Sequence, residues 1–188
     1  MKILPLFFLV LAQLASGSAM VASWMDARHI RKSYFEFTAA LAAAIFLGIS
    51  LWQAPVLSPF LFALFFALAA IWSFRLEHFV RGRLFLKASG LAGVSLGLYS
   101  LADGVGFLHG IPNPIAWLLF AGLIAGALLL GGVHATMVLG HWYLIMRNLD
   151  FKHLRRATKI CLSGFAEGLA HAAGFQAMSG KLRRLFRG

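Results

Sequence analysis

The sequence predicts an all-α fold, a polytopic helix bundle in a membrane, and its composition and charge pattern carry that prediction. Of its 188 residues 61% are hydrophobic and only 12% are charged, and the mean hydropathy is +0.82. This composition excludes a soluble domain. A spanning helix needs about 20 mostly apolar residues, so about five or six spans use up most of the chain and leave no room for an extramembrane domain.

The positive charges follow the pattern of membrane proteins. The formal net charge is +11, and all but Lys2 of the 17 Lys and Arg residues fall in the ranges 28–32, 75–87, 147–159 and 181–187. The connections 54–58 and 103–114 contain no Lys or Arg. This positive-inside distribution explains the charge without a polyanionic partner. We therefore expect no nucleic-acid binding, and we expect contacts with lipid headgroups and other membrane subunits.

The first expected span covers residues 3–25. Lys2, the apolar stretch after it and the small residues at 16–19 resemble a signal peptide, but the apolar run continues to Met25 and is long enough to cross a membrane. The basic residues at 28–32 outnumber Lys2, so we expect the N-terminus outside.

Three further spans are expected at 34–54, 57–74 and 84–102. Pro55 closes the second and Pro59 opens the third, so these two helices should be antiparallel neighbours. In the fourth, Gly93 and Gly97 are four residues apart, a spacing that lets another helix approach closely. Lys87 is near enough to the inner surface to snorkel to it.

The fifth expected span, 114–146, is the longest. Asn113 and Pro114 are typical of a helix start, and the next 32 residues contain neither proline nor charge. At 1.5 Å per residue this helix is about 50 Å long, against roughly 30 Å of hydrocarbon. We expect it to tilt, to kink at Gly131 and Gly132, or to project beyond the bilayer.

The segment 157–180 is the ambiguous one. Ser163, Glu167 and His171 recur every four residues and form one polar stripe, as in an interfacial amphipathic helix. We therefore expect five transmembrane helices plus a C-terminal amphipathic interfacial helix, with six spans as the alternative. The expected location is the bacterial inner (cytoplasmic) membrane, with the basic loops and the C-terminus inside.

The tryptophans and tyrosines agree with this layout. They fall at expected span ends, where residues with an apolar body and a polar tip form belts. The inner belt would contain Trp24, Tyr34, Trp72, Trp142 and Tyr143, and the outer belt Trp52, Tyr99 and Trp117.

Histidines on the fifth span are the candidate functional residues. His134 is expected well inside the bilayer, where polar groups usually face the bundle interior. His134 and His141 are seven residues apart, which places them on one face but about 10 Å apart along the axis, too far to ligate one iron atom. His134 could bind the iron of haem b, with His171 or another subunit giving the second ligand. The alternative is an interhelical hydrogen bond from His134 to a carbonyl or a serine.

The triplet His141, Trp142 and Tyr143 is a candidate quinone site. It combines hydrogen-bond donors, an aromatic wall and a titratable group within one turn. The alternative is that the aromatic residues anchor the helix and His141 faces headgroups. The single cysteine, Cys161, excludes an intrachain disulfide and a Cys-x-x-Cys motif.

Together these features predict an integral membrane subunit of a multi-subunit respiratory or electron-transfer complex. It would not be an enzyme by itself but a non-catalytic subunit of an oxidoreductase complex, helping to form a haem b or quinone pocket. Two alternatives are a structural or assembly subunit without a cofactor, which binds lipid and partner helices, and a small-solute transporter. The first three spans contain almost no polar groups for a transport path, which disfavours a transporter.

Overall fold

The computed structural model describes residues 3–25, 30–52, 59–104 and 113–145, and the single positions Arg155, Thr158, Lys159, Leu162 and Ala166. Every regular element in these ranges is a helix, which confirms the all-α class. In chain order the helices are α1 (Ile3–Ser23), α2 (Lys32–Trp52), α3 (Phe60–Arg75), α4 (Phe79–Ala92), the π-helix η1 (Gly93–Gly97), α5 (Leu98–Gly104) and α6 (Asn113–Ile145).

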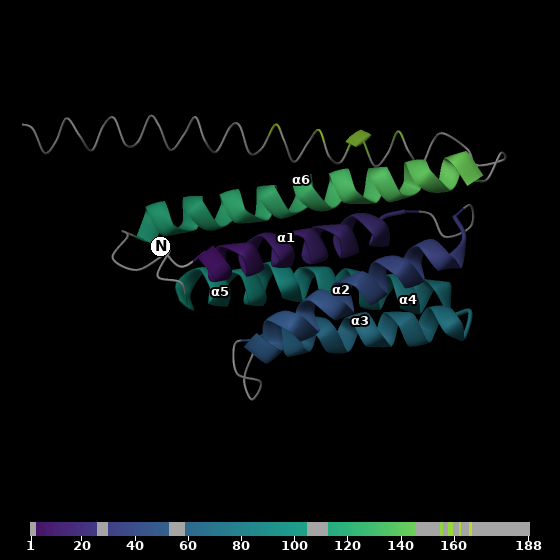
Figure 1. The fold of residues 1–188 in the computed structure, drawn as a ribbon, viewed down its shortest axis with the longest axis horizontal. Coiled ribbons are helices and arrows are strands. Elements are labelled where there is room, and N and C mark those ends of the chain that lie inside the picture. Colours follow the sequence, from purple (N-terminus) through teal and green to yellow (C-terminus); the bar gives the residue numbers. More distant parts are fainter. Residues whose placement is uncertain are drawn as a thin grey trace, which may run out of the picture.

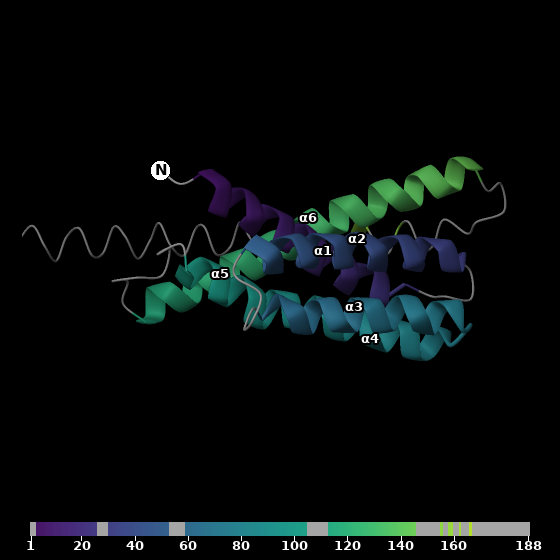
Figure 2. The ribbon, with the colours of Figure 1, turned by 60° about the horizontal axis from the view of Figure 1, so that its bottom comes forward.

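The helices lie side by side along the long axis of the molecule (Figures 1 and 2). Helix α1 is the central element, since it contacts α2, α4 and α6, while α3 packs between α2 and α4. The chain reverses direction from one long helix to the next, so the C-terminal ends of α1, α3 and α6 lie at the same end of the bundle (Figure 1). The described basic residues that follow α1 and those between α3 and α4 therefore lie at the same end.

Three helices are long and apolar enough to cross a membrane, over Leu6–Ser23, Lys32–Trp52 and Ile115–His141. Helix α3 is apolar but shorter, with 16 residues. Helices α4, η1 and α5 form one continuous helical run from Phe79 to Gly104. Helix α6 is uninterrupted over its 33 residues, and the helix is not broken at Gly131 and Gly132.

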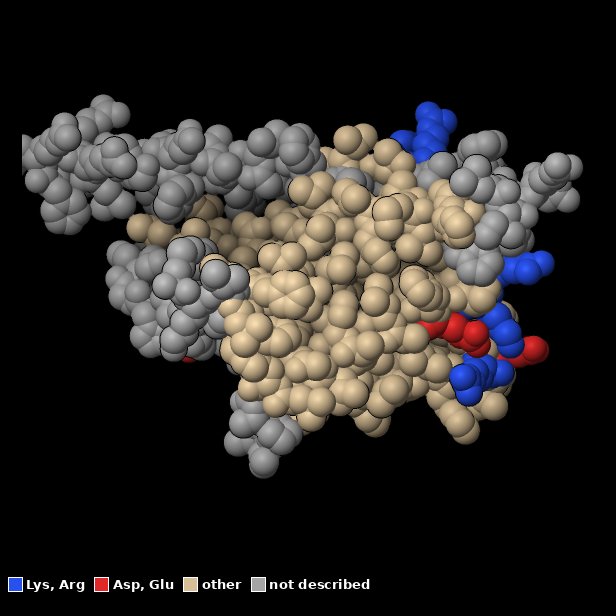
Figure 3. Space-filling view, in the orientation of Figure 1, with Lys and Arg blue, Asp and Glu red and all other residues tan. Residues whose placement is uncertain are grey.

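Charged side chains gather at one end of the bundle and leave its middle uncharged in the view of Figure 3. The described basic residues at or near the helix ends there are Arg31, Lys32, Arg75, Arg81 and Arg83, and Lys87 lies further along α4. An uncharged band bounded by a basic end is the surface that a lipid bilayer requires. The described basic residues are thus grouped at one end, as the sequence predicts for them.

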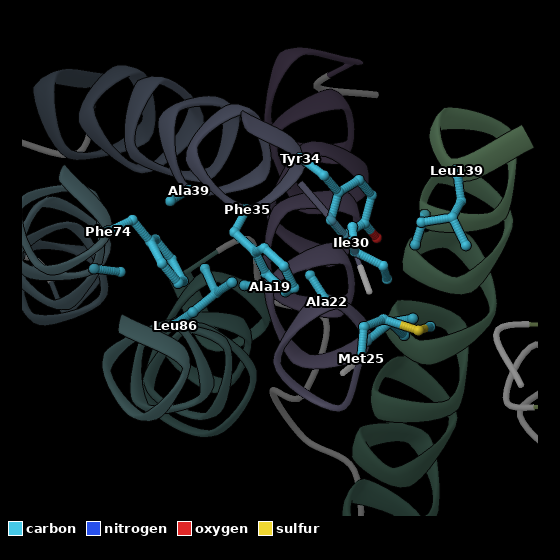
Figure 4. Packing of buried hydrophobic residues seen from close by; sticks show 13 residues of the cluster. Ala19, Ala22, Met25, Ile30, Tyr34, Phe35, Ala39, Phe74, Leu86 and Leu139 are labelled. Carbon is cyan, nitrogen blue, oxygen red and sulfur yellow. The ribbon is translucent and has the colours of Figure 1, made fainter. Parts of the chain in front are cut away.

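Two clusters of buried side chains form the core. The first surrounds the C-terminal half of α1, where Ala19 and Ala22 leave room for Phe35, Phe74 and Leu86 from the neighbouring helices (Figure 4). The second contains Phe46 and Phe60, whose rings stack with centroids 5.8 Å apart. Small residues on α1 thus face large aromatic residues on α2 and α3, which keeps the interior closely packed.

The expected packing at Gly93 and Gly97 is confirmed, although the local helix is a π-helix rather than an α-helix. A Cβ at Gly93 would meet Ser16 Oγ and the Phe46 ring, and one at Gly97 would meet the Phe60 ring. The absence of side chains at these positions therefore lets α1, α2 and α3 contact this part of the helical run.

The turn from α3 to α4 is closed by a Schellman motif with an unusual residue. The backbone N–H of His78 donates to the Ser73 carbonyl at 2.8 Å, and that of Glu77 donates to the Phe74 carbonyl at 3.1 Å. Glu77 takes the left-handed conformation, with φ 62°, at the position that glycine usually occupies.

The expected aromatic belts are found in part: Trp24 is half-buried against the second core cluster, and the side chains of Trp142 and Tyr143 lie outside the described part of the structure. Trp52, Trp72, Tyr99 and Trp117 are exposed near helix ends, as expected. The prediction for Tyr34 is wrong, because its side chain is 1% exposed. It packs in the first core cluster between α2 and α6 (Figure 4), and its hydroxyl forms no hydrogen bond within the described residues.

Candidate functional site at the α1–α6 contact

Helices α1 and α6 touch through their backbones. A Cβ at Gly17 would collide with the carbonyl group of Ala127, and a Cβ at Gly131 would collide with the backbone of Gly17 and Ser18. Close approach of this kind needs glycine on both helices, and it is how helices associate where no water drives apolar surfaces together. Gly131 therefore serves packing rather than a kink.

Two hydrogen bonds cross this contact. Gln13 Nε2 donates to the Leu123 carbonyl at 3.1 Å. Ser18 Oγ lies 3.0 Å from His134 Nδ1, and the direction of that bond depends on the tautomer of the imidazole. An unpaired polar group inside the hydrocarbon layer costs free energy. Each bond therefore stabilises a polar side chain that would otherwise have no hydrogen-bond partner in the lipid.

His134 is the candidate functional residue that the structure places most clearly. Its ring is half-buried against α1, as expected for a deep polar residue that faces the bundle. The Ser18 contact occupies Nδ1 and leaves Nε2 as the ring nitrogen for a ligand or a proton. Within the described ranges, no group of three or more His, Cys, Asp or Glu side chains could hold a metal ion.

The remaining predicted site residues do not join His134 in one site. His141 is exposed and lies seven residues further along α6, about 10 Å away along the axis. Trp142 and Tyr143 belong to α6, but their side chains fall outside the described part of the structure, and so does the whole of His171.

Sequence reasoning missed Ser18 and Gln13, the partners of α6. The signal was present, because Gln13 is a polar residue inside an apolar span. Ser18 belongs to the small residues 16–19 that resemble the end of a signal peptide. In the structure this run is the packing surface of α1, with Ser16, Gly17, Ser18 and Ala19 all buried.

Comparisons with known proteins add no family to this description: no protein-family model, curated protein or solved structure matches the chain.

Proposed function

We propose that this chain is an integral membrane subunit of a multi-subunit assembly and that α6 binds the helices of a partner subunit. The observation that carries the proposal is the uneven burial of the apolar helices. In the apolar window of α6 22% of the residues are buried, against 61% in that of α1. Helix α6 thus has a long apolar surface for contacts outside the chain.

The outer surface of α6 has features suited to a helix partner. Val133, Met137 and His141 are exposed and follow one another at four-residue spacing along one stripe. Gly140 lies beside this stripe and Gly122 nearer the other end, and a Cβ at either position would meet nothing within 4 Å. Small residues with open space permit backbone approach by another helix, which lipid contact does not require.

The contact with α1 gives this surface a fixed position. Helices α1 and α6 are locked by the pair Gly17 and Gly131 and by the bond between Ser18 and His134. The hydrogen bond with Ser18 gives His134 a polar partner on α1, so a histidine at this position does not require a cofactor. On this basis the assembly role is preferred to the redox role.

The proposal includes the topology inferred from the charges. The helical run 79–104 and α3 would be two further spans beside the three long apolar helices, giving five. The basic end of the bundle would face the cytoplasm of a bacterial cell, and the N-terminus would lie outside.

The experiment places a large side chain on the outer surface of α6. A Cβ at Gly140 or Gly122 would meet no described atom within 4 Å, so Gly140→Leu and Gly122→Leu should fold normally and block a partner helix. Gly48 on α2 is equally open, which makes Gly48→Leu a matched control. We expect native mass spectrometry of the membrane-extracted complex to show partner loss of about tenfold, near 1.4 kcal/mol, in the α6 variants only. Equal partner content in all of the variants would reject α6 as the binding surface.

A second candidate function, a haem b or quinone site in an electron-transfer complex, is favoured by the geometry of His134. Metal-ligating histidines usually hydrogen-bond through their other ring nitrogen, and Ser18 holds Nδ1 in that way. The second axial ligand would come from another subunit. A reduced-minus-oxidised visible spectrum of the complex tests it. If the spectrum shows no haem band, and the rate of quinone turnover is unchanged in His134→Ala and His141→Ala, the redox role is rejected.

A further inference from the structure

Lys87 occupies an unusual place on the outer surface of α4. Val80, Leu84 and Leu91 are exposed along one stripe of this helix, and the exposed Lys87 stands among them. Ser89 Oγ donates to the Ala63 carbonyl at 2.7 Å, which fixes this part of α4 beside the N-terminal half of α3. The exposed side chains on that part of α3 are apolar, with Phe65 65% and Leu68 52% exposed.

The position of Lys87 relative to the bundle end follows from helix geometry. Trp72 on α3 is 66% exposed and marks the headgroup level at the basic end. Lys87 lies level with about Phe65, since Ser89 contacts Ala63 and the two helices are antiparallel. The seven residues from Phe65 to Trp72 correspond to roughly 10 Å. The backbone of Lys87 is therefore beneath the headgroups, among lipid-facing apolar side chains.

The lysine side chain is directed toward the basic end. Side chains on an α-helix tilt toward its N-terminus, and the N-terminus of α4 lies at that end (Figure 1). The ammonium group can thus reach the headgroup level while its methylene groups remain in apolar surroundings.

A second cation lies one turn from Lys87. Arg83 precedes it by four residues on the same face of α4, and Arg83 Nε donates to the Ser23 carbonyl at the C-terminal end of α1, at 3.1 Å. Two like charges at this spacing repel each other. Among the described acidic residues at this end, Glu36 and Glu77, neither forms an ion pair with Lys87. An anion beside Lys87 would relieve both the repulsion and the cost of placing the charge near lipid.

We propose that Lys87 binds the phosphate of an anionic phospholipid, whose acyl chains lie on the stripe formed by Leu84 and Leu91. A phosphodiester without a compensating amine suits this place because Arg83 adds a second positive charge nearby. Zwitterionic lipids offer the same phosphate but also an ammonium group, which Arg83 and Lys87 repel. The inference is independent of the partner-binding role of α6.

The test compares bound lipids on the full chain in nanodiscs of equal phosphatidylglycerol and phosphatidylcholine content. Native mass spectrometry gives the ratio of the two lipids retained by each variant. Lys87→Met removes the charge and keeps an apolar, unbranched side chain, and Lys87→Arg restores the charge. Lys32→Met is the matched control, because Lys32 is exposed at the same end but lies at the first residue of α2.

We expect Lys87→Met to lower the preference for phosphatidylglycerol about fivefold, the factor for one basic residue near a membrane surface. Lys87→Arg should retain the preference, and Lys32→Met should change it less than twofold. Since Lys87 is exposed, the variants should elute as folded protein; Lys87→Gln is a second neutral variant and should show the same loss. A loss in Lys32→Met as large as in Lys87→Met would mean that only the overall surface charge matters, and the proposal would be overturned.

Discussion

The substitution Gly131→Ala is the sharpest perturbation of the α1–α6 contact. The added methyl group would lie on the backbone of Gly17 and Ser18, where no flexible side chain can move aside. The two helices must therefore separate. Separation weakens both hydrogen bonds between them, from Gln13 to Leu123 and between Ser18 and His134.

The expected change in the free energy of unfolding is the sum of two destabilising contributions and one stabilising contribution. Inserting a methyl group into a closely packed contact costs about 1–3 kcal/mol. Losing two interhelical hydrogen bonds at membrane depth adds about 0.6 kcal/mol each. Alanine regains up to about 1 kcal/mol, since it favours the helix more than glycine does. We expect the free energy of unfolding to fall by about 2 kcal/mol in total.

Steric trapping in bicelles measures this free energy directly. Gly140→Ala, on the same helix, is the control: it adds the same methyl group where nothing lies within 4 Å. It should be unchanged or up to about 1 kcal/mol more stable. If the free energies of unfolding of Gly131→Ala and Gly140→Ala differ by less than about 0.5 kcal/mol, the backbone contact between α1 and α6 does not exist as described.

Three further outcomes are expected. Glu77→Gly should stabilise the protein by about 0.5–1 kcal/mol in the same assay, because glycine removes the left-handed strain at φ 62°; a loss of stability would show that the Glu77 side chain contributes more than its backbone costs. A double-mutant cycle of Ser18→Ala and His134→Ala should give a coupling free energy of about 0.6 kcal/mol, and strict additivity would mean that the hydrogen bond contributes nothing. A cysteine at Gly188, in a Cys161→Ser background, should react with a membrane-impermeant maleimide only from the cytoplasmic side; labelling only from outside would rule out the five-span topology.

The all-helical class was predictable from the sequence because long apolar runs bounded by proline or charge are strong local signals. The start of α6 at Asn113 lies within a residue of the expected position, since Pro114 suits the first turn of a helix. The arrangement of the helices in the bundle was predictable in part from the positions of Lys and Arg, because basic turns on one side of a membrane must lie at one end of the bundle.

What could not be predicted depends on contacts between distant residues. Ser18 and His134 are 116 positions apart, and no local pattern pairs them. Tyr34 stands near a basic turn like the exposed aromatic residues, but α2 turns it toward α6 and the core. The left-handed Glu77 was hidden because the sequence offers no glycine where one is usual.

Site-specific photo-cross-linking tests the partner-binding role of α6 most directly. A photoreactive amino acid at Met137, which is 67% exposed on α6, is compared in intact membranes with one at Phe65, which is 65% exposed on α3. We predict that Met137 yields a protein adduct of one defined mass and that Phe65 yields lipid adducts. Lipid adducts alone at both positions would contradict the proposal that α6 binds another subunit.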